Sequence, residues 1–420
     1  MTSAHTGARI VRLMNKDSII SINPVSGGAA AAKGFVSGGV ICGVRNSGRR
    51  DLGLLYSEYP CFAAGVYTRN VFTGAPLSVT REAVEGDGLR AVVVNSGNAN
   101  AATGSQGVED AYRMQALAAK ALGVEAREVA VASTGVIGVH LPMEKIEKGI
   151  STAALGLGTD GRGFAEAILT TDTRIKQAAV QVEIGDETVT VGGTAKGSGM
   201  IEPNMGTMLA FLTTDAAVEK DCLQETLKNA TDHSFNRITV DGDTSPSDMA
   251  LLLANGAAGK EPLSMESPDH PAFAAAVETV AQSLAKEIAR DGEGATRLVE
   301  VVVEGARNEE SAARLAKAVV GSNLVKAAVF GEDANWGRVL VAMGYSGADF
   351  DPSNIELYFG PVKVFENGEP VPHDEAEANG ALEGEEVRIT ARLSEGDASA
   401  TAWGCDLTYE YVEINGSYRT

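Results

Sequence analysis

The segment KGSGMIEPNMGTMLAFLTTDA, residues 196–216, decides how the fold of this chain is understood. Its first half is broken by two glycines and by Pro203, which interrupt regular backbone structure. Its second half passes from Gly206 through Thr207 directly into an apolar run at 208–212. A short, continuous apolar run is typical of a buried strand. The segment therefore predicts a loop that enters a core strand, with a Gly-Thr junction where the strand begins.

Strand and helix patterns alternate along the rest of the chain. Short β-branched runs are typical of strands, and apolar residues at intervals of three and four are typical of helices. The predicted strands are 90–94, 129–132, a hairpin at 177–191, 207–214, 298–303, 324–329, 386–393 and 406–414. The predicted helices are 110–122, 143–154, 217–229, 271–290 and 309–321. The pattern predicts a mixed α+β protein in which mixed sheets pack against helices in layers.

The composition is that of an acidic globular protein. The formal charge is −21, because 35 Lys and Arg residues are set against 56 Asp and Glu residues. Such a surface repels phosphate backbones, so we do not expect a nucleic acid partner. We find no 18-residue apolar span for a membrane helix, no signal-peptide pattern, and no metal-ligand spacing among the four cysteines and five histidines. We therefore expect a cytoplasmic protein without a metal ion or a membrane partner.

Two motifs suggest binding roles that their context does not support. The string GLGTDG at 156–161 matches GxGxxG, but a predicted helix precedes it where a dinucleotide site requires a strand. The segment DGDTS at 241–245 begins like a calcium loop, but its sixth position is Pro246 instead of glycine. Ser198 lies between two glycines, with no histidine nearby to act as its base. Neither a nucleotide site nor a calcium site is predicted.

The Gly-Thr junction can be understood chemically. A threonine hydroxyl is a weak nucleophile, but a threonine at the start of a chain can use its own α-amine as the base. An internal threonine reaches that state if its Oγ attacks the preceding carbonyl and water then hydrolyses the ester. Gly206 leaves its carbonyl open to this attack, because glycine has no Cβ. The alternative is that Thr207 simply begins a core strand.

Specific motifs occur over essentially the whole chain. Besides KGSGMIEPNMGTML from 196, they are VVVNSGNANAATG from 92, ASTGVIG from 132, AILTTDT from 167, FNRITVDGDTS from 235, RDGEGATR from 290, FGEDANWGR from 330 and the ending INGSYRT. Together these motifs resemble the ornithine acetyltransferase family, the glutamate N-acetyltransferases or bifunctional proteins of arginine biosynthesis.

The resemblance implies a self-processed enzyme with an N-terminal threonine nucleophile. The precursor would be cut between Gly206 and Thr207 into an alpha chain, 1–206, and a beta chain, 207–420, and two such pairs would form a heterotetramer. Thr207 would take the acetyl group from N-acetylornithine and pass it to glutamate in a ping-pong reaction without a cofactor. Three alternatives remain open: acetyl-CoA as an additional donor, an amidohydrolase that releases acetate, and a binding protein that folds uncut.

The resemblance also implies roles for residues within the motifs. Thr134 and Gly135 match an oxyanion hole, which stabilises the negative charge that develops during acyl transfer. Lys196 would supply the cation for a substrate carboxylate, and Glu293 would pair with an amino group of the substrate. Further substrate contacts are implied for Thr170, Thr207, Asn415 and Thr420.

Two positions depart from the family pattern. Gly206 stands where the family commonly has alanine, which bears on the rate of the cut. Pro246, Ser247 and Asp248 follow DGDTS where the family usually has Thr-Asn-Asp, which bears on substrate preference.

Overall fold

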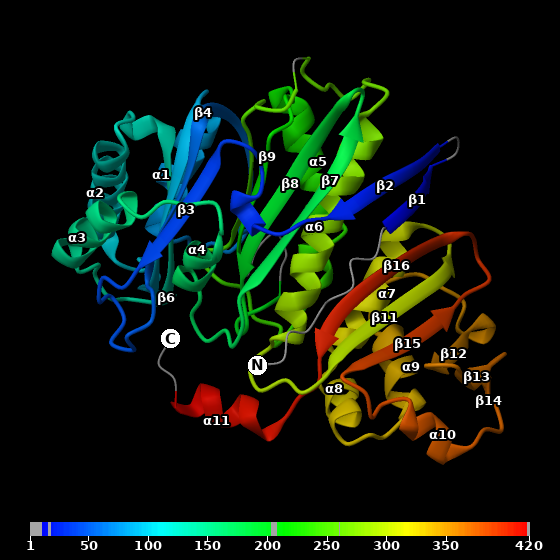
Figure 1. Cartoon of the computed structure of the whole chain (residues 1–420). Coiled ribbons are helices and arrows are strands. Elements are labelled where there is room, and N and C mark those ends of the chain that lie inside the picture. Colours follow the sequence, from blue (N-terminus) through cyan, green and yellow to red (C-terminus); the bar gives the residue numbers. More distant parts are fainter. Residues whose placement is uncertain (1–10, 16–17, 203–207, 260, 418–420) are drawn as a thin grey trace, which may run out of the picture.

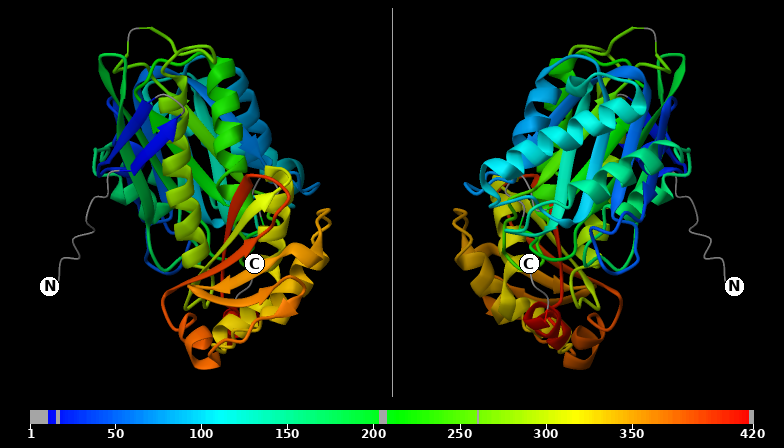
Figure 2. Two further views of the ribbon diagram at one scale, coloured as in Figure 1. Left: turned by 90° about the vertical axis from the view of Figure 1, so that its right-hand side faces the viewer. Right: turned by 90° about the vertical axis from the view of Figure 1, so that its left-hand side faces the viewer.

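The computed structural model describes residues 11–15, 18–202, 208–259 and 261–417. In this part of the chain the strands form two sheets, one of ten strands and one of six. Figure 1 shows the smaller sheet, drawn in yellow to red, beside the lower end of the larger one. The two side views in Figure 2 show the same arrangement, so the chain forms a larger unit and a smaller unit that contact each other.

The larger sheet has the order β1-β2-β7-β8-β9-β10-β4-β5-β6, with β3 paired to β4. Its strands are β1 Val11–Asn15, β2 Ser18–Pro24, β3 Phe35–Val40, β4 Leu52–Tyr67, β5 Leu89–Asn98, β6 Val129–Val136, β7 Lys176–Ile184, β8 Glu187–Lys196, β9 Leu209–Thr214 and β10 Met249–Ala254. The central strands β9 and β10 run parallel and are buried along their whole length. Strand β10 is apolar throughout and β9 is apolar up to Leu212, as expected for strands that are covered on both faces.

The long strand β4 folds the larger sheet into two layers. Residues 52–57 of β4 pair with β3 and β5, whereas residues 62–67 pair with β10. Side chains alternate along β9, so Leu209 and Phe211 face a core cluster between the two layers, where Phe211 contacts Phe164 edge-on. Ala210 and Leu212 face the opposite side, in a cluster that includes two helices. The unit is therefore a two-layered sheet with helices on its outer faces.

Helices cover the larger unit on both sides. They are α1 Ala75–Glu85, α2 Gly104–Leu122, α3 Met143–Ala154, α4 Arg162–Ala167, α5 Lys220–Asp232 and α6 His270–Arg290. Helices α2 and α3 share a core cluster with β4, β5 and β6, and α5 and α6 share one with β7 to β10. No helix in the described ranges is long and apolar enough to cross a membrane.

The smaller sheet has the order β14-β13-β12-β15-β11-β16 and its own core. Its strands are β11 Leu298–Ala306, β12 Glu356–Phe359, β13 Val362–Glu366, β14 Glu369–Pro370, β15 Glu386–Arg392 and β16 Ala398–Cys405. The accompanying helices are α7 Glu309–Gly321, α8 Asn323–Phe330, α9 Trp336–Gly344, α10 Glu375–Gly380 and α11 Tyr409–Ser417. Short 3-10 helices lie at Gly28–Ala30, Ala126–Glu128, Phe235–Arg237 and Pro352–Asn354. Leu298, Trp403 and Cys405 of this sheet join the core cluster of α6, which connects the two units.

The predicted layers of mixed sheets and helices are confirmed, and most predicted elements occur close to their expected bounds. The prediction of a strand at 324–329 is wrong, because these residues form α8. The Ser322 side chain accepts a hydrogen bond from the Val325 N–H and begins the helix, and Val325, Ala328 and Val329 are buried along it. That spacing of three and four residues is typical of a helix, whereas a short apolar run is compatible with either a helix or a strand.

The prediction of a strand at 406–414 is also wrong, because α11 occupies Tyr409–Ser417. The Asp406 side chain accepts hydrogen bonds from the backbone N–H groups of Thr296 and Arg297, at 2.8 and 3.0 Å. These bonds hold the chain at the end of β16, and in the described part of the protein the segment beyond pairs with no strand. Its alternating sequence therefore has nothing to pair with, and a helix satisfies the backbone instead.

The proposed alpha and beta chains, 1–206 and 207–420, are not separate structural units. Strands β9 and β10, from the second half of the sequence, lie between β8 and β4, from the first half. Lys196 of β8 pairs with Leu209 of β9, and Leu209 pairs in turn with Met249 of β10. The sequence on either side of the Gly-Thr junction therefore builds one continuous sheet.

Candidate active site

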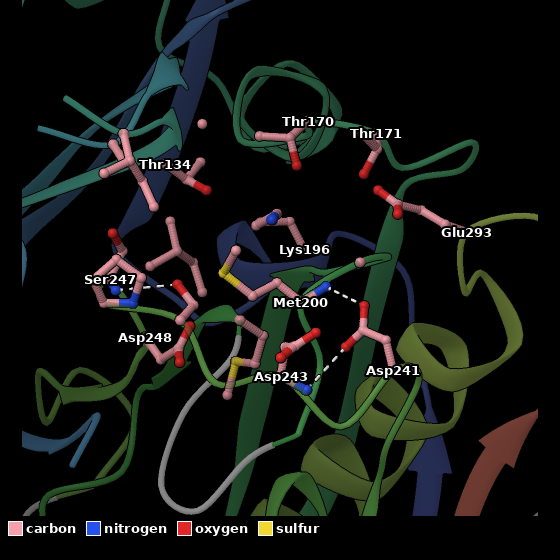
Figure 3. A pocket seen from close by; sticks show the side chains of 18 of the residues that line it. Thr134, Thr170, Thr171, Lys196, Met200, Asp241, Asp243, Ser247, Asp248 and Glu293 are labelled. Carbon is pink, nitrogen blue, oxygen red and sulfur yellow. Dashed lines mark hydrogen bonds between the residues drawn. The ribbon is translucent and has the colours of Figure 1, made fainter. Parts of the chain in front are cut away.

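A pocket of about 230 Å³ lies where β6 and β8 end and where β9 and β10 begin. Figure 3 shows Thr134, Thr170, Lys196 and Glu293 arranged around it. Six of the predicted site residues line this pocket: Thr134, Gly135, Thr170, Lys196, Glu293 and Asn415. The predictions for Gly206, Thr207 and Thr420 lie outside the described residues. Met208, the residue after the junction, lines the pocket.

The proposed oxyanion hole lies at the end of β6, which runs parallel to β5. Gly135 lies opposite Gly97 and has a φ of +130°. A Cβ at position 135 would lie 2.3 Å from the carbonyl carbon of Gly97, so only glycine fits there. The Ser133 hydroxyl donates to Asn95 Oδ1 at 2.6 Å and links the two strand ends. The strands therefore fix Thr134 and Gly135 in place at the pocket wall.

Lys196 is the last residue of β8, and its side chain is buried. Burial lowers the pKa of Lys196, while the nearby charges of Asp172, Asp248 and Glu293 oppose that decrease. Among the described residues that line the pocket, Lys196 is the only lysine or arginine. The ammonium group of Lys196 is therefore the positive charge with which a substrate carboxylate in the pocket could pair.

A buried ion cluster is hydrogen-bonded to the backbone at Thr170 and at the residue after Lys196. Lys176 Nζ lies 2.7 Å from Asp172 Oδ1 and 2.6 Å from Asp291 Oδ2, and all three side chains are almost completely buried. Asp172 also accepts hydrogen bonds from the backbone N–H groups of Gly197 and Thr170, at 2.8 and 2.9 Å. The cluster therefore ties together three segments that meet at the pocket: the loop after α4, the end of β8 and the end of α6.

Burial tends to raise the pKa of Asp172, but the charges of Lys176 and Lys196 outweigh it and hold that pKa below its ordinary value. An aspartate in an unfolded chain has a pKa of about 3.9. The Asp172 carboxylate therefore stabilises the folded protein above that pH, and this contribution is lost as the pH falls through the lower, folded pKa.

Replacing Lys176 with methionine should lower the free energy of unfolding by about 3–5 kcal/mol, because two buried carboxylates lose their shared cation. Unfolding in urea measures the change. Lys228→Met is the control, since Lys228 makes exposed ion pairs with Glu225 and Asp232 on α5, and such pairs contribute about 0.5 kcal/mol or less. Equal effects of the two substitutions would contradict a structural role for the cluster.

Glu293 and Asn415 meet on the other side of the pocket. Asn415 Nδ2 donates to Glu293 Oε2 at 2.7 Å. The carboxylate lies against Gly199, where a Cβ would come within 2.3 Å of Glu293 Cδ. Tyr411 lines the pocket one helical turn before Asn415 on α11. The helix that replaces the predicted strand is therefore what brings Asn415 to the site.

Sequence reasoning missed a group of pocket residues between positions 241 and 248. Asp241, Asp243, Ser245, Pro246, Ser247 and Asp248 all line the pocket. Asp241 accepts hydrogen bonds from the backbone N–H groups of Met200 and Ile201, at 2.6 and 2.8 Å. The sequence signal is present, since DGDTS is one of the family motifs and residues 246–248 depart from the family pattern, but neither feature assigns these side chains to the pocket. In the described ranges, no group of three or more His, Cys, Asp or Glu residues could hold a metal ion.

The acidic residues change the electrostatics of the pocket. Burial, followed by the charge of Asp241, raises the pKa of Asp243. Burial, together with the charges of Asp241, Asp243 and Glu293, raises the pKa of Tyr411. Four carboxyl groups, Asp241, Asp243, Asp248 and Glu293, therefore surround one lysine. Such a pocket can hold a molecule that carries both a carboxylate and amino groups.

The GLGTDG segment lacks the preceding strand that a dinucleotide-binding motif requires. Helix α3 precedes it, and Gly158 forms an isolated bridge with Ser37 in β3. The prediction that its context is wrong for a nucleotide motif is confirmed.

The buried lysine, the hydroxyl and glycine at a strand end and the ring of carboxyl groups define an enzyme active site for a small polar molecule. Residues 36–420 match the ArgJ family, and the chain belongs to that family. The expectation of an enzyme of arginine biosynthesis is thereby confirmed.

Two similar proteins cover almost the whole chain, and a solved structure covers half of it. The arginine biosynthesis bifunctional protein ArgJ of Symbiobacterium thermophilum is 57% identical over 399 residues, which are 94% of this chain and 99% of that protein. The protein of the same name from Bacillus subtilis is 52% identical over 408 residues, 97% of this chain and 99% of that protein. A crystal structure of the Bacillus halodurans ArgJ protein is 48% identical, with a TM-score of 0.49, and matches 50% of this chain and 100% of that one.

Proposed function

We propose that this enzyme moves the acetyl group from N-acetylornithine to glutamate through an acetyl ester on Thr207. The observation that carries the proposal is the convergence of Thr134, Gly135, Thr170, Lys196, Glu293 and Asn415 on one small pocket. These residues come from motifs far apart in the sequence, and both β6 and the start of β9 meet there. The family membership supports the place of the reaction in arginine biosynthesis.

The position at which β9 begins supports Thr207 as the nucleophile. Met208 and Leu209 line the pocket, and the Met208 carbonyl accepts a hydrogen bond from the Met249 N–H at 3.0 Å. Thr207 directly precedes Met208, and consecutive Cα atoms are about 3.8 Å apart. A cut before Thr207 would therefore leave its new α-amine within reach of the pocket. The alpha and beta chains would remain joined through the pairing of β8 with β9.

The first half-reaction transfers the acetyl group to the enzyme. The Thr207 α-amine takes the proton of Oγ, and Oγ attacks the acetyl carbonyl of N-acetylornithine. Thr134 and the Gly135 N–H stabilise the resulting oxyanion. The C–N bond then breaks, the α-amine returns its proton to the leaving nitrogen, and ornithine departs. In the second half-reaction the glutamate amine attacks the ester and restores the Thr207 hydroxyl.

Substrate binding would use the charges around the pocket. Lys196 would pair with a substrate carboxylate, and Thr170 and Asn415 would add hydrogen bonds. Glu293 would bind an amino group, and Thr420 would contact the substrate from the end of the chain. The volume of about 230 Å³ is below the roughly 300–1,000 Å³ of pockets for drug-sized ligands, which suits an amino acid derivative.

The test is isotope exchange. In a ping-pong reaction, N-acetylornithine incubated with labelled ornithine and no glutamate should become labelled, because the acetyl-enzyme returns its acetyl group to free ornithine. Adding glutamate should divert the acetyl group to N-acetylglutamate. Exchange that is absent while glutamate still reacts would contradict the ester intermediate. Release of acetate as the main product would show an amidohydrolase instead.

The word "bifunctional" in the names of the relatives supports a second activity. We propose acetyl-CoA as the additional donor. The test is whether N-acetylglutamate forms when acetyl-CoA replaces N-acetylornithine in the reaction with glutamate. The heterotetramer and the cytoplasmic location stay predictions.

A further inference from the structure

Arg45 is a charged residue close to the active site that the proposed reaction does not use. It lies in the loop at 41–51, between β3 and β4, and its side chain reaches across to the loop after α4. Its two terminal nitrogens donate to two successive backbone carbonyls, Nη1 to Leu169 at 2.7 Å and Nη2 to Thr170 at 2.8 Å. Arg45 does not line the pocket, whereas Thr170 does. The arginine therefore holds the backbone that carries a proposed substrate contact.

The loop that carries Arg45 is anchored by Asp51, whose side chain is buried. The carboxylate accepts hydrogen bonds from three backbone N–H groups, those of Cys42, Gly43 and Arg45, at 2.6, 3.0 and 2.9 Å. The Asp51 carbonyl accepts a further hydrogen bond from the Ser96 N–H at 2.9 Å, near the end of β5. The backbone of Arg45 is therefore fixed relative to β5, so its side chain can hold a second segment at a defined place.

The stem of Arg45 lies against the end of β5, which supports the proposed oxyanion hole. A Cβ at Gly97 would lie 2.3 Å from Arg45 Cγ, so only glycine leaves room for the stem. Gly97 in turn lies opposite Gly135 of β6. Figure 3 shows Thr134, the neighbour of Gly135, and Thr170 at the wall of the same pocket. Arg45 therefore links the oxyanion side of the pocket to the backbone of Thr170.

The backbone of Thr170 is held on both sides. Its N–H donates to Asp172 Oδ2 at 2.9 Å, and its carbonyl accepts from Arg45. Its hydroxyl lies 3.5 Å from Asp172 Oδ2, which is too long for a strong hydrogen bond, so the hydroxyl remains available to a molecule in the pocket. Hydrogen bonds from a charged guanidinium group are about twice as strong as neutral ones, and its planar fork fixes their direction. Removing Arg45 would release the carbonyl side of Thr170 while Asp172 still holds the N–H.

We propose that Arg45 is a positioning residue, which sets the place of the Thr170 hydroxyl relative to the proposed oxyanion hole of Thr134 and Gly135. This inference rests on the proposed function, since it assumes that Thr170 contacts the substrate. Catalysis depends on the accurate placement of such contacts, and a displacement of about 1 Å can cost about 100-fold in rate. Arg45 provides that accuracy without touching the substrate.

The experiment is a double-mutant cycle that combines Arg45→Met with Thr170→Val. Methionine keeps an apolar stem against Gly97 but donates no hydrogen bond, and valine keeps the shape of threonine without its hydroxyl. Values of kcat and KM are measured for N-acetylornithine and for glutamate, on protein whose cut has been confirmed by intact mass. Each single substitution should lower kcat/KM by about 10- to 100-fold, the contribution of one hydrogen bond to a charged group.

The combined variant separates positioning from a general structural role. If Arg45 acts through the Thr170 hydroxyl, Arg45→Met should lower kcat/KM by less than about threefold in protein that already carries Thr170→Val, because residues that share one interaction are not additive. The two single variants should also divide their losses between kcat and KM in the same proportion. A loss that reflects only a looser fold would instead add to that of Thr170→Val.

Two further variants complete the comparison. Lysine keeps the charge and can donate to one carbonyl but lacks the planar fork of arginine, so Arg45→Lys should lie between the wild type and Arg45→Met. Arg49 is an exposed residue of the same loop and lies outside the lining of the active-site pocket. Arg49→Met is therefore the matched control and should keep the wild-type kinetics.

Two results would overturn the inference while the proposed function stands: Arg45→Met keeps the wild-type kinetics, or its loss adds in full to that of Thr170→Val. If Arg45→Met does not fold or is not cut, the same cycle with Arg45→Lys decides the matter, and wild-type kinetics or additive losses there count against the inference. A Thr170→Val protein with wild-type kinetics would instead remove Thr170 from the proposed substrate contacts, and the inference with it.

Discussion

Purified Thr207→Ala protein should remain one chain of 420 residues, whereas the wild-type protein should yield chains spanning 1–206 and 207–420. Alanine has no hydroxyl to attack the Gly206 carbonyl, so the precursor cannot cut itself. Acetyl transfer should fall by about 10⁴-fold or more, as when other enzymes lose their nucleophile. Intact mass under denaturing conditions measures the cut, and formation of N-acetylglutamate measures the transfer.

Thr207→Ser is the matched control, because serine keeps the hydroxyl and lacks only a methyl group. It should still be cut and should still transfer acetyl groups, at reduced rates. A Thr207→Ala protein that is cut at the same bond would mean that another residue performs the attack. An uncut wild-type protein would mean that glycine at position 206, where the family commonly has alanine, prevents the reaction.

Lys196→Met should lower kcat/KM for both N-acetylornithine and glutamate by about 10²- to 10³-fold, because removing one partner of a buried charge pair costs about 2–5 kcal/mol. Both substrates carry a carboxylate, and no other lysine or arginine lines the pocket in the described part of the chain. Steady-state kinetics on the cut protein provide the measurement. Methionine keeps most of the buried volume of the side chain, so the fold should be retained.

Lys286→Met is the control, since Lys286 makes a partly buried ion pair with Glu300, outside the pocket lining. Its kinetics should match those of the wild type. Lys196 should also give the wild-type reaction a pH dependence. Because burial lowers the pKa of Lys196, carboxylate binding should weaken as the pH rises through that lowered pKa, below the range where an exposed lysine loses its proton. A Lys196→Met protein with unchanged kcat/KM would exclude Lys196 as the carboxylate partner.

The sequence predicts elements well where a local pattern and its boundaries agree. Helix α7 matches the predicted bounds, because Asn308 accepts a hydrogen bond from the Ser311 N–H, two glutamates follow in the first turn, and Gly321 ends the helix. The run at 324–329 lacked so clear a start, and its apolar residues suit a strand as well as a helix. Ser322, the cap of α8, was the available signal.

The sequence identifies several residues of the site, but it does not predict how they are arranged. The motifs identify Thr134, Lys196 and Glu293 as residues of interest, but only the folded chain brings them to one pocket. The role of Asp172 depends on Lys176 and on Asp291, which is more than a hundred positions away. No local pattern encodes such contacts, because they depend on how distant strands and helix ends meet.

The position of β9 and β10 has a consequence for how the protein must be made. A first half produced alone would leave the edges of β8 and β4 open, and unpaired strand edges recruit other chains. A single precursor supplies the missing strands in equal number and at high local concentration, so the gap closes within one molecule. Synthesis as one polypeptide thus protects the nascent sheet from aggregation, and under the proposed function folding would precede the cut before Thr207.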